Sequence, residues 1–167
     1  AALEKQADQA QVVAALAERA TRDAATQALV GAGGRAVPAL VEALRRQVKL
    51  RAVLQGILRN IGEPAVPALI GLLGERDKTL VEAVGVTLGR IGAPAAEALV
   101  AALPQGGSAV AETLVSMGTR AVDALTTALK SDKHGQRAQA AELLGRVGDR
   151  RATEALVGAL NDTWFDV

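Results

Sequence analysis

The chain has 167 residues, half of them hydrophobic, and its 19 basic and 18 acidic residues leave a net charge of +1. Charges this evenly balanced create no strong field to attract nucleic acid or an anionic membrane. The absence of cysteine excludes disulfides, thiol catalysis and cysteine-ligated metals. Alanine, leucine and valine make up most of the apolar residues, and because alanine and leucine are strong helix formers we expect an all-α protein.

A short phrase that runs from a glycine to an Ala-Leu pair recurs five times. Its copies end at leucines spaced 29, 30, 26 and 31 residues apart, namely Leu40, Leu69, Leu99, Leu125 and Leu156. Repetition at this period is typical of proteins that stack one supersecondary unit along an axis. We therefore expect a single repeat domain over residues 1–167, a fragment of a longer protein, with units near 21–46, 48–76, 77–104, 107–131 and 133–161.

The first predicted element is a helix over residues 3–20. Its Val12, Val13 and Leu16 are placed like the apolar residues in the second helix of a preceding unit. No apolar run approaches the roughly 20 residues of a membrane span, so no such span is expected.

Each unit is predicted to be a helical hairpin. The first helix ends at the repeat glycine, which tolerates the backbone conformation found just past a helix C-terminus. A second helix begins a few residues later, with Pro38 and Pro67 in its first turn in two of the copies. The 26-residue step predicts that the first helix of the fourth unit, within residues 107–117, is shorter by about a turn. We expect this to change the superhelical curvature locally around residues 104–110.

The clearest first helix is predicted over residues 136–147, in the fifth unit. Short carboxylates that can cap the following helices stand at three junctions between units, at Asp77, Asp132 and Asp162. After the last of them a further first helix opens. It contains the only aromatic residues, Trp164 and Phe165, which either pack into a next unit or form an exposed hot spot.

One series of residues is most complete in the fifth unit. It consists of Arg137, Ala140, Ala141, Leu144, Gly145, Val147, Gly148, Asp149, Ala152, Ala155, Leu156 and Asp162. This series resembles the HEAT-like repeat of the phycobilisome lyase type, and the resemblance extends over nearly the whole chain, although the fourth unit lacks the arginine. It implies a right-handed alpha-alpha superhelix of about five hairpins with terminal half-units, whose second helices line the concave surface. The functions it implies are bilin lyase subunits, protein scaffolds, regulatory modules and, in distant relatives, DNA glycosylases.

Counting from the repeat leucine as zero, positions −3, 0, +1 and +4 of each second helix share one face, and we expect them to be buried. Positions −2, +2 and +5 should then face outward. They predict a neutral to mildly acidic groove of small residues that suits a partner helix or an extended peptide. The candidate partner-binding residues on it are Glu42, Arg45, Gly71, Glu97, Ala101, Asp123, Thr127, Lys130 and Gly158. The alternative is that small residues here only permit tight curvature.

Arginines also gather near the turns, at Arg35, Arg120 and Arg150 among others. They form either a basic edge for an anionic partner or solvated cations that interact with helix C-termini. His134 is the only histidine, so neither a histidine-based metal site nor a Ser-His-Asp triad can be assembled. We therefore expect no metal site, no cofactor and no enzyme activity.

The leading prediction is a non-enzymatic scaffold or regulatory module that binds another protein or a peptide segment through the concave face. The alternative is a bilin lyase subunit or a fragment of one. A helical-repeat protein that binds DNA is a third hypothesis, which the balanced charge and the scarcity of aromatics disfavour, so no nucleic acid is expected. The oligomeric state is left open.

Overall fold

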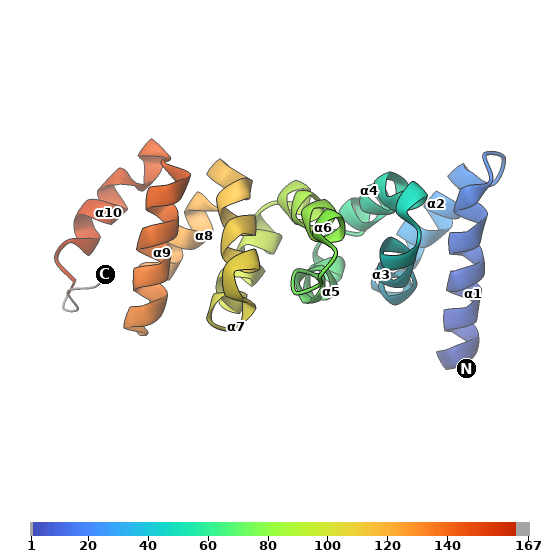
Figure 1. Cartoon of the computed structure of the whole chain (residues 1–167), viewed down its shortest axis with the longest axis horizontal. Coiled ribbons are helices and arrows are strands. Elements are labelled where there is room, and N and C mark those ends of the chain that lie inside the picture. Colours follow the sequence, from blue (N-terminus) through green and yellow to red (C-terminus); the bar gives the residue numbers. More distant parts are fainter. Residues whose placement is uncertain (1, 163–167) are drawn as a thin grey trace. The chain divides into compact units, whose positions relative to one another are not determined.

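The computed structural model describes residues 2–162 of the chain, with side chains from Asp8 onward. These residues form α-helices joined by short 3-10 turns and loops, which confirms the prediction of an all-α repeat fold (Figure 1). The chain divides into two compact units, Ala1–Thr87 and Leu88–Val167. Each is described by itself below.

The first unit contains two complete hairpins. The elements are α1 (Ala2–Ala14), α2 (Arg22–Ala32), α3 (Val37–Arg46), α4 (Arg51–Ile61), α5 (Val66–Leu72) and most of α6 (Lys78–Ile91). Helix α2 packs on α4, whereas α1 packs on α3 and α3 packs on α5. First helices therefore stack on first helices and second helices on second helices. Helix α1 takes the place of a second helix, as the pattern of its apolar residues predicts.

The predicted helix over residues 3–20 is too long. Helix α1 ends at Ala14 and is followed by a single 3-10 turn over Ala15–Ala17, after which the backbone becomes extended at Glu18. Side chains from the next helix meet the carbonyls of that turn. The hydroxyl of Thr21 donates to Ala15 O at 2.7 Å, and Arg22 Nε donates to Leu16 O at 2.9 Å.

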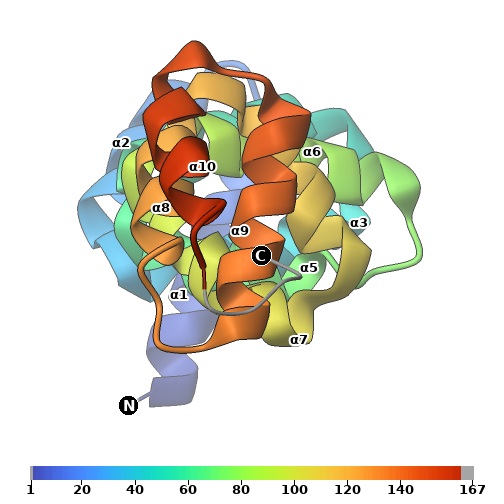
Figure 2. The same cartoon turned by 90° about the vertical axis from the view of Figure 1, so that its left-hand side faces the viewer.

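The second unit contains α7 (Ala93–Met117), α8 (Val122–Ala128), α9 (His134–Val147) and α10 (Thr153–Ala159). In Figure 2 the second helices α8 and α10 lie on one side, and α9 lies with the later part of α7 on the other. Gly107, with φ 58° and ψ −160°, divides α7 into two helices. Residues 93–106 complete the third repeat and 108–117 form the first helix of the fourth. This first helix is about a turn shorter than the 14-residue α9, as predicted.

Positive φ angles confirm the predicted role of the repeat glycines. Gly148 has φ 67° and ψ 24°, the left-handed helical conformation. Gly62 instead has φ 75° and ψ −135°, and a 3-10 turn over Glu63–Ala65 leads from it into α5. Because that combination of angles is open mainly to glycine, the residue sets the direction in which the chain turns back.

Burial follows the predicted columns at positions −3 and 0 in the first four repeats, whereas Val41 and Ile70 at +1 and Leu129 at +4 are only half-buried. The repeat leucines Leu40, Leu69, Leu99 and Leu125 are fully buried. At position +4, Leu44 is fully buried, whereas Leu160, the residue after α10, is 84% exposed. Each hairpin therefore buries its apolar stripe largely through its stacked neighbours, which is the behaviour of a repeat protein.

The stretch Ala93–Arg120 is long and apolar enough, by length and composition alone, to cross a membrane, which was not expected from the sequence. A core helix of a soluble protein meets the same criterion. The break at Gly107 divides this stretch between two repeats, and residues from both halves, including Leu99 and Leu114, are fully buried. We therefore interpret its two halves as repeat helices.

Candidate partner-binding groove

The second unit has an open groove of about 420 Å³ on the side of its second helices, which we call the second-unit groove. Its lining comes from the first half of α7, the start and face of α8, and the connection to α9. The lining residues are Ala93, Glu97, Val100, Ala101, Arg120, Asp123, Ala124, Thr127, Ala128, Ser131 and Gln136. Four of the nine candidates named from the sequence are thus brought together, namely Glu97, Ala101, Asp123 and Thr127.

Two buried leucines orient the helices that form the walls of the groove. Leu99 in α7 and Leu125 in α8 are fully buried on the opposite side of their helices, which turns the residues two positions away from each of them outward. Ala101 and Ala124 are among these outward or flanking positions, and their small side chains leave space between the two helices. The volume lies within the range of about 300–1,000 Å³ that is typical of ligand pockets.

Carboxylates stand on both walls of the groove. Glu97 on α7 and Asp123 on α8 are exposed, and Arg120 lines the same depression. The pKa of the nearby Arg151 guanidinium is raised, first by its hydrogen bond with Asp149 and more weakly by the charge of Asp123. The groove therefore combines an apolar floor with a rim that carries two acidic side chains and one basic side chain.

The polar groups at the far end of the groove are already hydrogen-bonded. Ser131 Oγ donates to Gln136 Oε1 at 2.7 Å, and the hydroxyl of Thr127 donates to the carbonyl of Asp123 at 2.9 Å. These bonds fix the side chains of Thr127 and Ser131 in the groove.

The first unit has a smaller groove of about 260 Å³ between α1 and α3. It is lined by Ala10, Val13, Pro38, Ala39, Glu42, Ala43, Arg46 and Gln47. Five of the α3 residues stand at positions −2, −1, +2, +3 and +6 from Leu40, the positions that Asp123, Ala124, Thr127, Ala128 and Ser131 hold relative to Leu125. The same repeat positions therefore build a groove in each unit.

The remaining candidates lie elsewhere. Arg45 binds Glu75 at 2.8 Å and, with Arg46, flanks the carboxylate of Glu42 in the first-unit groove. Gly71, Lys130 and Gly158 are exposed but line neither groove. Position +5 thus contributes to neither depression, whereas the alanines at −1 and +3, which the sequence did not single out, contribute to both. Only the place of these alanines between two stacked helices could have identified them as groove residues.

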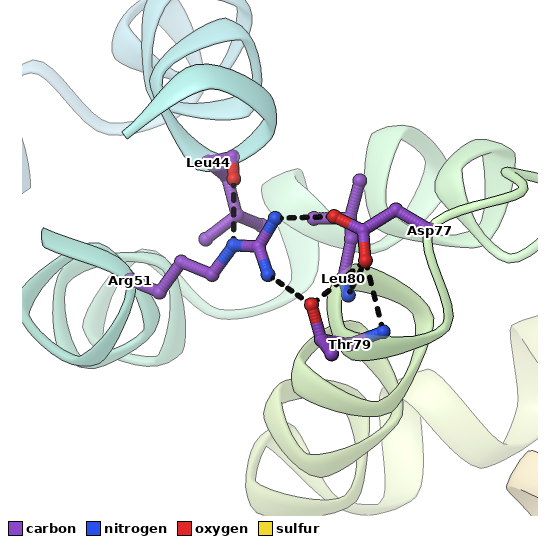
Figure 3. Close-up of polar contacts among 5 residues, drawn as sticks. All are labelled: Leu44, Arg51, Asp77, Thr79 and Leu80. Carbon is purple, nitrogen blue, oxygen red and sulfur yellow. Dashed lines mark hydrogen bonds and ion pairs between the residues drawn. The ribbon is translucent and has the colours of Figure 1, made fainter. Parts of the chain in front are cut away.

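An arginine clasp ties successive repeats together in the first unit (Figure 3). Arg51 Nε donates to Leu44 O at 3.2 Å, while its Nη1 and Nη2 donate to Thr79 Oγ1 and Asp77 Oδ2, both at 2.6 Å. Asp77 Oδ1 also accepts from the backbone N–H groups of Thr79 and Leu80 at 3.0 and 3.2 Å. Asp77 therefore caps α6, as predicted, and at the same time connects it to α3 through Arg51.

The second unit repeats this clasp. Arg137 Nε and Nη2 donate to the two carboxylate oxygens of Asp162 at 2.6 and 2.8 Å, and Nη1 donates to Ser131 O at 2.9 Å. The resemblance to the HEAT-like series names Arg137 and Asp162 but not their pairing across 25 residues. The predicted cap at Asp132 is wrong, because Ser131 Oγ, and not Asp132, accepts from Lys133 N at 3.2 Å. The helix that Asp162 was predicted to cap, with Trp164 and Phe165, lies outside the described residues.

The clasp of the first unit predicts sensitivity to acid. Hydrogen bonds from the Thr79 hydroxyl, then the Arg51 guanidinium and the Leu80 N–H, hold the pKa of Asp77 well below its ordinary value. A depressed carboxyl pKa stabilises the fold above the unfolded pKa of about 3.9, and this contribution is lost as pH falls toward the folded pKa. Asp77→Asn should therefore lower the free energy of unfolding at pH 7 and flatten its decline below about pH 4.

Urea unfolding at a series of pH values between 7 and 2 measures this effect. Asp8→Asn, a change at an exposed aspartate of α1, should leave the stability profile close to that of the unaltered chain. If Asp77→Asn and the unaltered chain lost stability in parallel as the pH falls, the clasp would not be the source of the acid sensitivity.

Comparison with known families agrees with this architecture. A family model described as HEAT repeats matches residues 104–167, and one described as PBS lyase HEAT-like repeat matches residues 21–46. No curated protein matches the chain. The repeat register, the stacked hairpins within each unit and these two matches show that the chain is built of HEAT-like repeats, with the PBS lyase type of repeat matched over residues 21–46.

Proposed function

We propose that this repeat scaffold is a non-enzymatic interaction module and that it binds another protein through the second-unit groove. The observation that carries the proposal is the groove itself, a preformed depression of about 420 Å³ with small apolar side chains below a charged rim. Protein interfaces combine these features, with an apolar centre and a polar edge. Grooves between helices also accept partner helices or extended segments.

Two further observations support binding over catalysis or mere curvature. The first-unit groove uses the same repeat positions, so a groove accompanies the repeat in both units. In the second-unit groove, the hydroxyl of Thr127 donates to the carbonyl of Asp123 and Ser131 Oγ donates to the amide oxygen of Gln136, and neither acceptor is a base that activates a hydroxyl. The arrangement offers contact area and not a nucleophile.

Filling the groove should abolish binding without unfolding the chain. Ala101 is an exposed helical residue on the floor, so Ala101→Arg places a long side chain in the depression at a position where arginine is a good helix former. The probe is a displayed library of random dodecapeptides, selected on the immobilised unaltered chain. The selected peptides should bind Ala101→Arg at least about tenfold more weakly, the equivalent of about 1.4 kcal/mol.

The matched control adds the same charge elsewhere in the same unit. Ser116 is exposed in the later half of α7 and lines no groove described above, so Ser116→Arg should leave peptide affinity unchanged. Thr127→Arg offers a second obstruction on the opposite wall, with the same added charge as the control. Peptides that bind Ala101→Arg and Thr127→Arg as tightly as the unaltered chain would contradict the proposal.

A bilin lyase subunit is the second candidate, supported by the match of residues 21–46 to the PBS lyase HEAT-like repeat. A subunit of this kind should bind a bilin alone or with a partner subunit. Titration with phycocyanobilin, followed by visible absorbance, separates the two candidates. The interaction-module proposal expects no saturable spectral change, and such a change would favour the lyase.

A further inference from the structure

We propose that the second-unit groove accepts a lysine or arginine side chain of the partner, with the alkyl stem on the floor and the charged end between Glu97 and Asp123. The inference rests on the proposed function and specifies the chemistry of the segment that binds. Lysine and arginine carry an apolar stem and a charged tip, and such side chains lie along apolar surface while the tip reaches polar groups. The groove has the complementary arrangement.

The floor supplies the apolar half of this match. Val100 and Ala101 from α7 and Ala124 and Ala128 from α8 line the groove between its two walls. Alanine is the main component, so the floor is open enough for a linear stem, whereas larger side chains would close it. Val100 is buried, with only 7% of its surface exposed, and gives the floor a fixed apolar base.

The carboxylates supply the charged half. Glu97 and Asp123 occupy the same position, −2 from the repeat leucine, in consecutive repeats, and both line the groove. None of the ion pairs among the described side chains of residues 8–162 involves either of them. In the first-unit groove, by contrast, Glu42 already pairs with Arg46 at 2.6 Å. The acidic side chains of the second-unit groove are therefore not held in such an ion pair, and the charge of Asp123 acts on Arg151 only at longer range.

Removing the charge of Arg120 should have the opposite effect on affinity from removing the charge of Glu97 or Asp123. Arg120 lines the same groove and opposes the field of the two carboxylates, which leaves the charged lining residues with one negative charge in excess. Removing its charge should strengthen the binding of a cationic segment. A gain of affinity cannot result from damage to the fold.

The experiment uses the same displayed dodecapeptides and compares the peptides selected on the unaltered chain with the input library. Lysine and arginine should be enriched beside aliphatic residues. Each of Glu97→Gln and Asp123→Asn should lower the binding affinity of the selected peptides about two- to fivefold. Arg120→Gln should raise that affinity by a similar factor, the range expected for exposed ion pairs. Added salt should reduce all three effects.

The outcomes separate this inference from the proposed function. Loss of binding in Ala101→Arg, combined with unchanged affinity in Glu97→Gln, Asp123→Asn and Arg120→Gln, would overturn the cation site and leave the groove as the binding surface. Enrichment of acidic peptides would overturn it as well. If the selection yielded no peptide whose binding is weakened by Ala101→Arg, the proposed function itself would be contradicted. This inference would then be contradicted as well.

Discussion

Leu44→Ala is expected to lower the free energy of unfolding of the first unit by about 2–5 kcal/mol, the range for truncating a buried leucine. Leu44 stands at position +4 of its repeat and is fully buried. The change removes apolar contacts and leaves a cavity that the stacked helices can fill only in part. Urea unfolding followed by circular dichroism measures the loss.

A matched substitution at the same repeat position tests whether stacking is the cause. Leu160 also stands at +4, but just after α10 and 84% exposed, so Leu160→Ala should change stability by no more than about 0.5 kcal/mol. Equal losses in Leu44→Ala and Leu160→Ala would show that repeat position, and not burial by neighbouring hairpins, determines the contribution of these leucines.

Arg137→Ala is expected to destabilise the second unit by about 2–4 kcal/mol, because it leaves a largely buried carboxylate without its main cation. The side chains of Arg137 and Asp162 are only 13% and 14% exposed, and they are joined by two hydrogen bonds of 2.6 and 2.8 Å. Arg137 also donates to Ser131 O. One substitution therefore releases both the end of α8 and the segment after α10.

Two controls separate geometry from charge. Arg137→Lys keeps the charge but cannot reproduce the planar two-point contact, so it should recover only part of the lost stability in urea unfolding. Arg150 is an exposed arginine of the following 3-10 turn, and Arg150→Ala should change stability by no more than about 0.5 kcal/mol. A full recovery with Arg137→Lys would mean that charge alone holds this junction.

Local rules predicted the hairpins well. The turn at Gly62 and the first-turn Pro67 depend on the conformational limits of single residues, and both are confirmed. Periodicity likewise predicted the burial of Leu40, Leu69, Leu99 and Leu125, but not the partial exposure of Leu156 in the last hairpin. The end of α1 was missed because it depends on side chains of the next helix, Thr21 and Arg22, which bind the carbonyls of the last turn.

The groove and the clasps were only partly predictable. A helical wheel identifies the outward positions of one helix, and two of these, Ala101 and Thr127, line the second-unit groove. It cannot tell which outward columns of two neighbouring helices enclose a depression, since that depends on the distance and angle between the helices. The same limit applies to Arg51 and Asp77, which lie 26 residues apart and meet only when the repeats stack.

The central claim, that a partner segment binds in the second-unit groove, is tested most directly by mapping backbone amide chemical shifts during titration with a selected dodecapeptide. The largest shifts should fall on residues 93–101 and 120–131, which include the groove walls at Glu97 and Asp123. Shifts confined to α9, or to the arginines beside the turns, would contradict the claim and place the binding surface on the first helices or on the basic edge.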